Sequence, residues 1–267
     1  MSDSSQPIHR HLIAVVGKGG VGKTAFTALM TTILVRNRYK ARILAIDADP
    51  ATGLPIALGV DVRRNMGEVR DEIIKTARTA KNERKVELAN MLDYMVFETL
   101  IELDGYSLIA MGRSEADGCF CPVNDLLRAA IEDLSSSFDI VLIDGEAGLE
   151  QINRKVMRNV DTLITVTDLS VRGFQAANTI KKIADSGKVV KCKKLGLVVN
   201  RVKPGEEELA SKSAKETGLE LLGFVPEDEN LARYDSTGQP LLEIANTSPS
   251  IVAVAEVLRK LELVQIK

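Results

Sequence analysis

The chain has little cysteine: three residues in 267. Two of them, Cys119 and Cys121, are separated by a single residue, and the third, Cys192, has no cysteine near it in the sequence. This number and spacing exclude the disulfide framework of a small secreted protein, and cytosolic thiols are kept reduced. We therefore expect Cys119 and Cys121 to be free to bind a ligand and Cys192 to be structural.

Long apolar runs and an excess of one charge are also missing. No run reaches the roughly 18 apolar residues that a membrane-spanning helix needs, and the first residues, MSDSSQPIHRH, lack the apolar middle of a signal peptide. Lys and Arg number 35 against 37 Asp and Glu, so the chain has no overall basic field to hold nucleic acid. We expect a soluble, cytoplasmic protein that binds neither membrane nor nucleic acid.

Short apolar runs rich in β-branched residues recur along the chain and are typical of buried strands. Stretches with helical spacing lie between most of them, for example Phe26, Leu29, Met30 and Ile33. This alternation predicts right-handed crossovers and a mostly parallel sheet with helices on both faces, a doubly wound, three-layer α/β fold. With 45% hydrophobic residues the chain can bury a sizeable core, and we expect residues 1–267 to form one domain. The predicted strands are 11–16, 42–46, 107–111, 139–143, 162–167, 195–199 and 221–225.

The pattern changes between about residues 61 and 104. This region is charged and contains no proline, and its spacing predicts two helices inserted before the third strand. No linker, repeat or low-complexity segment interrupts the chain elsewhere.

The sequence GKGGVGKT, residues 17–24, follows the first predicted strand and precedes a helix, as the phosphate-binding pattern G-x-x-x-x-G-K-[ST] requires. Glycines let backbone N–H groups surround phosphate oxygens, and the helix N-terminus adds partial positive charge. Lys23 would neutralise the β- and γ-phosphates, and the Thr24 hydroxyl would ligate Mg²⁺. The alternative is a chance glycine turn. We expect ATP or ADP with Mg²⁺ to be bound by Gly19, Gly20, Val21, Gly22, Lys23, Thr24 and Ala25.

Carboxylates end two further predicted strands. Asp144 ends IVLID, and Gly148 follows it where the backbone can respond to the γ-phosphate. Asp47 and Asp49 lie in LAIDADP. Ligands bind beyond the carboxyl ends of parallel strands, so we predict Asp47 and Asp144 near Mg²⁺ and Asp49 as the residue that orients the attacking water. The alternative for Asp47 and Asp49 is a cap in an Asp-Pro turn.

Lys18 is not needed by the phosphate loop itself, because it lies five positions before Lys23 and cannot easily serve the same nucleotide. KGGVGKT, DADP, Asp144 with Gly148, and VVNRV together resemble the deviant Walker A ATPases, the group that includes MinD, ParA and the nitrogenase iron protein. The resemblance covers nearly the whole chain. It implies an ATP-dependent homodimer in which Lys18 reaches the phosphates of the opposite subunit, so that Lys18 joins Lys23 and Asp49 as a catalytic residue. The alternative for Lys18 is an ordinary exposed lysine.

The same resemblance implies an adenine site. Asn200, in NR after a strand, matches the asparagine that reads adenine in that family, and VPEDENL is similar to the segment that lines the base. The alternative for Asn200 is a turn former at a strand end. The implied residues are Asn200, Arg201, Pro226, Glu227 and Asp228.

Residues 108–128, LIAMGRSEADGCFCPVNDLLR, are similar to the nickel-insertion accessory ATPases of carbon monoxide dehydrogenase, the CooC type. In an extended segment Cys119 and Cys121 point the same way and can chelate one Ni²⁺ or Zn²⁺, and a helix beginning near Asn124 would favour their thiolates. The pair supplies two of the four ligands such a metal takes, and a two-fold dimer would supply the others. The resemblance implies carbon monoxide dehydrogenase or acetyl-CoA synthase as the client. Inert packing or redox chemistry is the alternative for the pair.

Two other classes stay open. A MinD- or ParA-like positioning ATPase would act on membrane or DNA, but the C-terminal tail has the spacing of a helix that docks on the sheet, and its exposed face is not notably basic. An iron-sulfur electron donor would need cysteines from two separated loops, and only one close pair is present. The chain also departs from the family pattern at Gln151, where relatives often carry histidine, and after Asp49, where ATGLP replaces a segment that often contains asparagine. The first departure could mean a different client.

Overall fold

An eight-stranded sheet forms the centre of the molecule, in the order β3-β4-β2-β5-β1-β6-β7-β8. The structure is a computed structural model that describes residues 10–37, 41–79, 91–115, 121–146 and 156–264. All neighbouring strands are parallel except β3 and β4. The strands are β1 His11–Val16, β2 Ile43–Asp47, β3 Ile101–Leu103, β4 Tyr106–Ala110, β5 Ile140–Asp144, β6 Asn159–Thr167, β7 Lys191–Val202 and β8 Glu220–Pro226.

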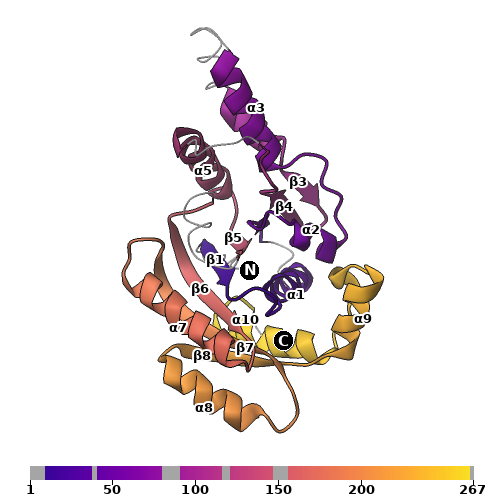
Figure 1. The fold of residues 1–267 in the computed structure, drawn as a ribbon. Helices are drawn as coiled ribbons and strands as arrows, with labels where there is room; N and C mark the ends of the chain where they lie inside the picture. Colours follow the sequence, from indigo (N-terminus) through magenta and orange to yellow (C-terminus); the bar gives the residue numbers. More distant parts are fainter. Residues whose placement is uncertain (1–9, 38–40, 80–90, 116–120, 147–155, 265–267) are drawn as a thin grey trace, which may run out of the picture.

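Helices cover both faces of this sheet, which confirms the predicted doubly wound, three-layer fold (Figure 1). Alternate residues of β1 show the two faces: Ile13 and Val15 pack into the core under α1 and α10, whereas Ala14 and Val16 pack into the core that includes α3 and α5. Residues 91–97 are also helical. The other helices are α1 Lys23–Asn37, α2 Gly53–Leu58, α3 Met66–Thr79, α5 Cys121–Ser135, α7 Val171–Asp185, α8 Glu207–Thr217, α9 Glu229–Thr237, α10 Pro249–Lys260 and the short 3₁₀ helix η1 Leu241–Glu243.

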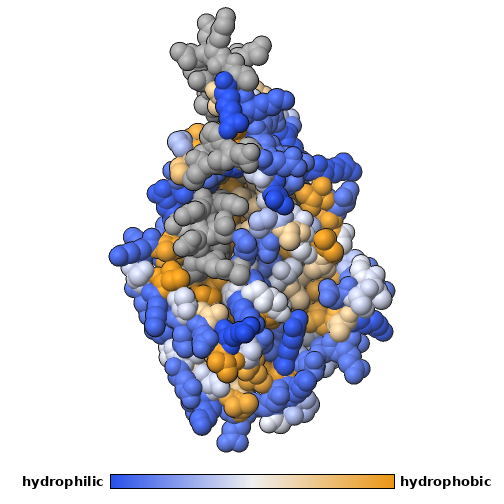
Figure 2. Space-filling view, in the orientation of Figure 1, coloured by the Kyte–Doolittle hydropathy of each residue, from blue (hydrophilic) through white to orange (hydrophobic). Residues whose placement is uncertain are grey.

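The region predicted as two inserted helices contains α3 and the helix at 91–97, and residues 80–90 between them lie outside the described part. The prediction was wrong at its end, because β3 is a strand that pairs antiparallel with β4. A three-residue strand is too short to show a period of two, and its partner across the turn at Gly105 defines it. This region projects from the body as α3, whose exposed surface is mostly hydrophilic in Figure 2.

The C-terminal helix α10 packs against the sheet and α1, as its spacing predicts. Most of its large apolar residues are buried, with Val252 exposed, and no helix in the described part of the chain is long and apolar enough to cross a membrane. The buried residues are Ile251, Val254, Val257, Leu258 and, just after the helix, Leu261.

The strand register brings the predicted carboxylates together. Asp144 pairs with Asp47 on one side and with Val15 on the other, so the ends of β2, β5 and β1 lie at one level. The loop after β1 therefore lies beside two aspartates that are nearly 100 positions apart in the sequence. This edge of the sheet is where a doubly wound fold binds its ligands.

Candidate functional site

The loop between β1 and α1, residues 17–22, has three glycines with positive φ, and at two of them a Cβ would also clash with the neighbouring strands. Gly17 has a φ of 151°, and a Cβ there would lie 2.1 Å from the carbonyl oxygen of Val166; Gly22 has a φ of 89°, and a Cβ there would lie 2.5 Å from Asn200 Nδ2. A Cβ at Gly19 or Gly20 would meet no described atom within 4 Å. The loop is thus packed against β6 and β7 but open over its middle, as a phosphate cradle requires.

Lys23 begins α1, and its side chain is buried, with the residue 8% exposed. Its ammonium donates a hydrogen bond to the carbonyl oxygen of Lys18 at 3.3 Å. Burial lowers the pKa of Lys23, and the negative charges of Asp144, Asp49 and Glu146 oppose that decrease. Lys23 thus places a buried positive charge where the phosphates of a nucleotide would bind. The negative charge of a triphosphate would then take over from these carboxylates in balancing Lys23.

Asp144 is one of two fully buried carboxylates of the site, at 1% exposure beside 0% for Asp47. Burial raises its pKa to about 7, although hydrogen bonds from the Thr24 and Thr27 hydroxyls and the charge of Lys23 oppose the shift. Its Oδ2 atom is buried without a hydrogen-bond partner among the described residues. An unsatisfied carboxylate oxygen beside a threonine hydroxyl is a donor set that suits Mg²⁺, so Asp144 and Thr24 fit the predicted metal position.

Asp47 shapes the turn that follows β2. Its Oδ1 accepts a hydrogen bond from the backbone N–H of Asp49 and its Oδ2 accepts one from Leu54, both at 2.9 Å. Burial raises its pKa to about 6, and these two N–H donors oppose the shift. Asp49 is only partly buried, and its Oδ1 accepts a hydrogen bond from Ala51 N–H at 2.9 Å. Asp47 therefore holds the turn in shape, and its predicted place in the Mg²⁺ shell and the water-orienting role of Asp49 stay predictions.

The Lys18 side chain approaches Asp168, the residue that follows β6. Its ammonium lies 4.0 Å from Asp168 Oδ2, and the two side chains are 38% and 27% exposed. Asp168 is held in turn by the backbone N–H and hydroxyl of Ser170 at the start of α7. An exposed ion pair of this length contributes about 0–1 kcal/mol, so Lys18 can leave it at little cost. The sequence analysis missed Asp168, although an aspartate at the end of a predicted strand was the signal.

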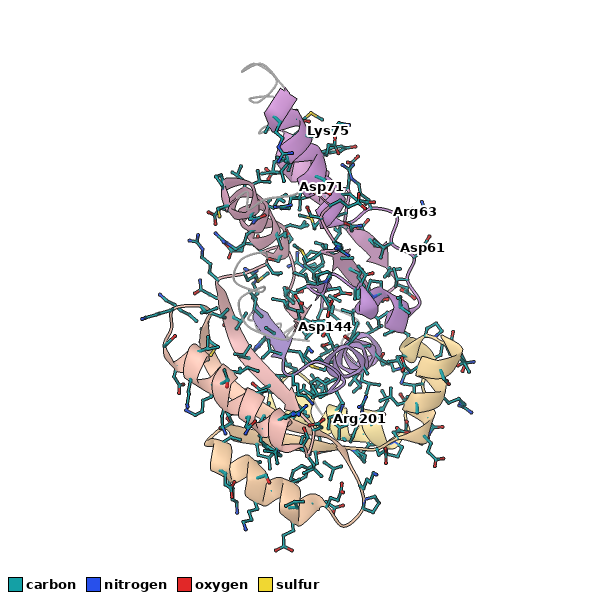
Figure 3. All side chains as sticks on the ribbon, in the orientation of Figure 1. Asp61, Arg63, Asp71, Lys75, Asp144 and Arg201 are labelled. Atoms are coloured by element: carbon teal, nitrogen blue, oxygen red, sulfur yellow. The ribbon has the colours of Figure 1, made fainter. Side chains whose placement is uncertain are left out.

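The residues predicted to contact adenine brace the loop and the neighbouring helices. Asn200 is 5% exposed and donates from Nδ2 to the Val21 carbonyl at 2.8 Å, while Arg201, with a φ of 58°, donates to the Gly20 carbonyl at 3.1 Å. Figure 3 shows Asp144 near the start of α1 and Arg201 near the end of β7. β7 thus positions the phosphate loop from the side, a role that no local pattern indicates.

The other part of the predicted adenine site lies at the end of β8. Pro226 is its last residue, Glu227 N–H donates to the Val202 carbonyl at 3.1 Å, and Asp228 caps α9. The Asp228 carboxylate is 7% exposed and accepts hydrogen bonds from Asn230 N–H and from donors of Ser248 and Ser250. Because the Asp228 carboxylate accepts hydrogen bonds from these protein groups, it positions α9 and α10. Direct contact of Pro226, Glu227 and Asp228 with adenine stays a prediction.

Cys121 is exposed and is the first residue of α5. The helix begins there and not near Asn124, so Cys121 is not in the extended segment that was predicted for the pair. A thiol in the first turn of a helix has its thiolate stabilised by the helix dipole. Cys119, Gly148 and Gln151 lie outside the described residues. Within the described ranges no group of three His, Cys, Asp or Glu side chains could hold a metal, so the C-x-C metal site stays a prediction.

Glu146 is a charged residue of the site that the sequence analysis overlooked. It follows Asp144 by two positions, its charge acts on Lys23, and its Oε2 atom is buried without a hydrogen-bond partner in the described part of the chain. An acidic residue directly after the strand-ending Asp-Gly was the available signal.

Comparison with known proteins agrees with this geometry. The model of the CobQ/CobB/MinD/ParA nucleotide binding domain matches residues 12–241. The chain belongs to this family. It is therefore a nucleotide-binding ATPase, and ATP and ADP are its nucleotides.

Three similar proteins place it within the family. An uncharacterised ATP-binding protein of Methanocaldococcus jannaschii is 41% identical over 94% of this chain and 98% of its own. The carbon monoxide dehydrogenase accessory protein CooC of Rhodospirillum rubrum is 29% identical over 85% of this chain and 87% of its own. The solved structure of the MinD cell division protein of Aquifex aeolicus matches with a TM-score of 0.68 at 20% identity, over 96% and 98% of the two chains.

Replacing Asp228 with asparagine tests its capping role. Burial would raise its pKa, but hydrogen bonds from Ser248, Ser250 and Asn230 outweigh burial and lower the pKa to about 2. Because the folded pKa lies below the unfolded value, the ionised form stabilises the fold fully above about pH 4, and this contribution is lost as the pH falls toward 2. We expect Asp228→Asn to lower the urea midpoint most at neutral pH and progressively less below pH 4. Asp235→Asn, at an exposed position of α9, is the control, and a pH-independent difference would contradict the assignment.

Glu146→Gln should tighten nucleotide binding. The substitution removes a negative charge that faces Lys23, where the phosphates approach, so we expect the Kd for ADP and for a non-hydrolysable ATP analogue to fall about three- to tenfold. Titration calorimetry at fixed salt measures this change. Glu216→Gln makes the same charge change on the exposed surface of α8 and should leave the Kd unaltered. Weaker binding by Glu146→Gln would show that the carboxylate supports the site.

Proposed function

We propose that the protein is a single-domain, ATP-dependent metallochaperone whose homodimer binds Ni²⁺ or Zn²⁺ through Cys119 and Cys121 and assists nickel insertion into carbon monoxide dehydrogenase or acetyl-CoA synthase. The observation that carries the proposal is the position of Cys121, exposed in the first turn of α5 at the nucleotide-binding edge of the sheet. The 29% identity to CooC over most of both chains supports the same function.

A continuous set of contacts joins the nucleotide site to α5. The carbonyl of Asp47 accepts a hydrogen bond from Met111 N–H at 2.8 Å, and the Met111 carbonyl accepts one from the second residue of α3, also at 2.8 Å. From α3, Arg70 Nε donates to Asn124 Oδ1 at 2.9 Å. Asn124 lies one helical turn after Cys121, so a shift of the turn after β2 has a short path to the thiol.

Features at both ends of the site support the proposed dimer. Within the described residues the Lys18 ammonium is held only by a long, partly exposed ion pair, so it could turn to a nucleotide in a second subunit. The C-x-C pair supplies two thiolates, and a tetrahedral or square-planar metal takes four ligands, so two subunits would complete one metal site. When ATP binds the closed dimer more tightly than the open one, it shifts the population toward the form with four thiolates together.

Metal analysis with and without a non-hydrolysable ATP analogue tests the proposal. Protein purified from its native host should contain about one metal ion per dimer, because two subunits share four ligands. Cys119→Ser/Cys121→Ser should lose the metal and keep its ATP affinity, while the control Cys192→Ser should keep both. A metal content that does not respond to the double substitution rejects the site.

A MinD- or ParA-like positioning ATPase is the second candidate, because the family named for those proteins matches the chain. Such a protein would bind a membrane or DNA in its ATP form, but four of the five large apolar residues of α10 are buried and only Val252 is exposed, which leaves no apolar face for a lipid surface. Co-sedimentation with anionic liposomes and with duplex DNA, each with ATP and with ADP, separates the two functions. We expect no ATP-dependent binding to either, and strong binding would favour the positioning function over metal delivery.

A further inference from the structure

A cavity of about 260 Å³ lies beside the nucleotide site and outside it, between α3, α5 and the segment that follows β4. One wall is Pro50, in the turn after β2 that Asp47 and Asp49 shape. Figure 3 shows Asp71 on the same helix, α3, that forms another wall. The lining residues are Pro50, Met66, Gly67, Arg70, Met111, Gly112, Arg113, Ser114, Asn124 and Leu127.

Two glycines hold the walls in close contact. Gly112 has a φ of 59°, and a Cβ there would lie 2.4 Å from the side chain of Asn65, which begins the turn into α3. A Cβ at Gly67 would lie 2.4 Å from the Arg113 carbonyl oxygen. Both positions therefore require glycine, because a larger residue would push α3 away from the segment after β4. The cavity is a built feature of the packing between these two elements.

The lining is apolar at its base and positive at its rim. Met66, Met111 and Leu127 are buried and supply the base. Among the residues that the structure describes, Arg70 and Arg113 are the charged residues of the lining, and no carboxylate is among them. Asn124 lies in the first turn of α5, whose helix dipole adds further positive potential.

The guanidinium of Arg70 is held in position. Its Nε donates to Asn124 Oδ1 at 2.9 Å and its Nη1 to the Ser114 hydroxyl. The nearest acid, Asp71, accepts hydrogen bonds from the Ser114 hydroxyl and from Glu115 N–H at 2.7 Å. Asp71 also forms an ion pair of 3.8 Å with Arg70 Nη1, so the charge of Arg70 is partly balanced within the wall, whereas Arg113 is exposed and is the cation that an incoming group can reach. This arrangement suits an incoming anion with an apolar neighbour.

We propose that this pocket binds an acidic side chain, together with an adjacent leucine-sized apolar side chain, from the protein that the ATPase serves. The volume is smaller than the roughly 300–1,000 Å³ of most small-molecule sites and fits a short peptide segment better. The proposal rests on the proposed function for the existence of a client, and it gives that client a docking site near Cys121. Because Pro50 forms a wall, the nucleotide state of the adjoining turn changes the shape of the pocket and hence its affinity.

A library of random 12-residue peptides displayed on phage, selected on the full-length protein, tests this pocket without knowledge of the client. We expect the enriched peptides to carry Asp or Glu beside Leu, Met or Phe. For a synthetic copy of an enriched peptide, Arg113→Glu should raise the Kd at least tenfold, whereas Lys212→Glu, the same charge change on the exposed surface of α8, should leave it unaltered. The Kd should also differ between the ADP form and the form with a non-hydrolysable ATP analogue.

Other outcomes overturn the proposal. Enriched peptides without acidic residues, or peptides that bind Arg113→Glu as well as the unaltered protein, would exclude an anion-binding pocket. If no peptide is enriched and free succinate binds in an Arg113-dependent manner, the pocket takes a small carboxylate and not a client segment. The measurement involves neither cysteine nor metal, so a failed metal analysis of Cys119→Ser/Cys121→Ser and a failed peptide selection are separate results.

Discussion

Burial of charge at the carboxyl edge of the sheet is the constraint on which the nucleotide site depends. Lys23, Asp144 and Asp47 are each at most 8% exposed, and each has its pKa shifted by burial in the direction that disfavours its charged form. The loop, β2 and β5 hold these groups together although burial disfavours each charge and Asp47 and Asp144 repel each other, and the charge of Lys23 offsets only part of that cost. A magnesium nucleotide carries the complementary charges, so binding relieves a cost that folding has already imposed.

Hydrogen bonds of the same buried residues connect the nucleotide site to the helices beside it. The two carboxylate oxygens of Asp47 accept hydrogen bonds from the backbone N–H groups of Asp49 and Leu54. A shift of Asp47 would therefore move the whole turn after β2. Its carbonyl is bonded to Met111, and through that segment the movement reaches α3 and α5. The opposite side of the site is fixed, because Asn200 and Arg201 bond to carbonyls of the phosphate loop. The nucleotide site is therefore braced by β7 on one side and is bonded on the other, through the turn after β2, to α3 and α5.

Sequence patterns predicted the features that depend on residues close together in the chain. The phosphate loop depends on spacing within eight residues, and the strands depend on continuous apolar runs, so both could be recognised without a structure. The bracing role of Asn200 depends on Val21, 179 positions away, and the capping role of Asp228 depends on Ser248 and Ser250. No local pattern carries such pairings. β3 and the earlier start of α5 were missed for the related reason that short elements and helix ends are decided by tertiary contacts.

These constraints determine which residues can change to give the protein a different partner. Residues that hold the phosphates must keep their places relative to three strands, which leaves little freedom for a new function there. The edge formed by α3, the segment after β4 and α5 is bonded to the movable turn but takes no part in holding the loop. A change of side chain at Arg113 or Cys121 alters what this edge presents to another molecule while the charge cluster at Lys23 stays intact. Under the proposed coupling, a single ATPase design would serve different partners, since nucleotide binding would move the edge and the residues on the edge would select the partner.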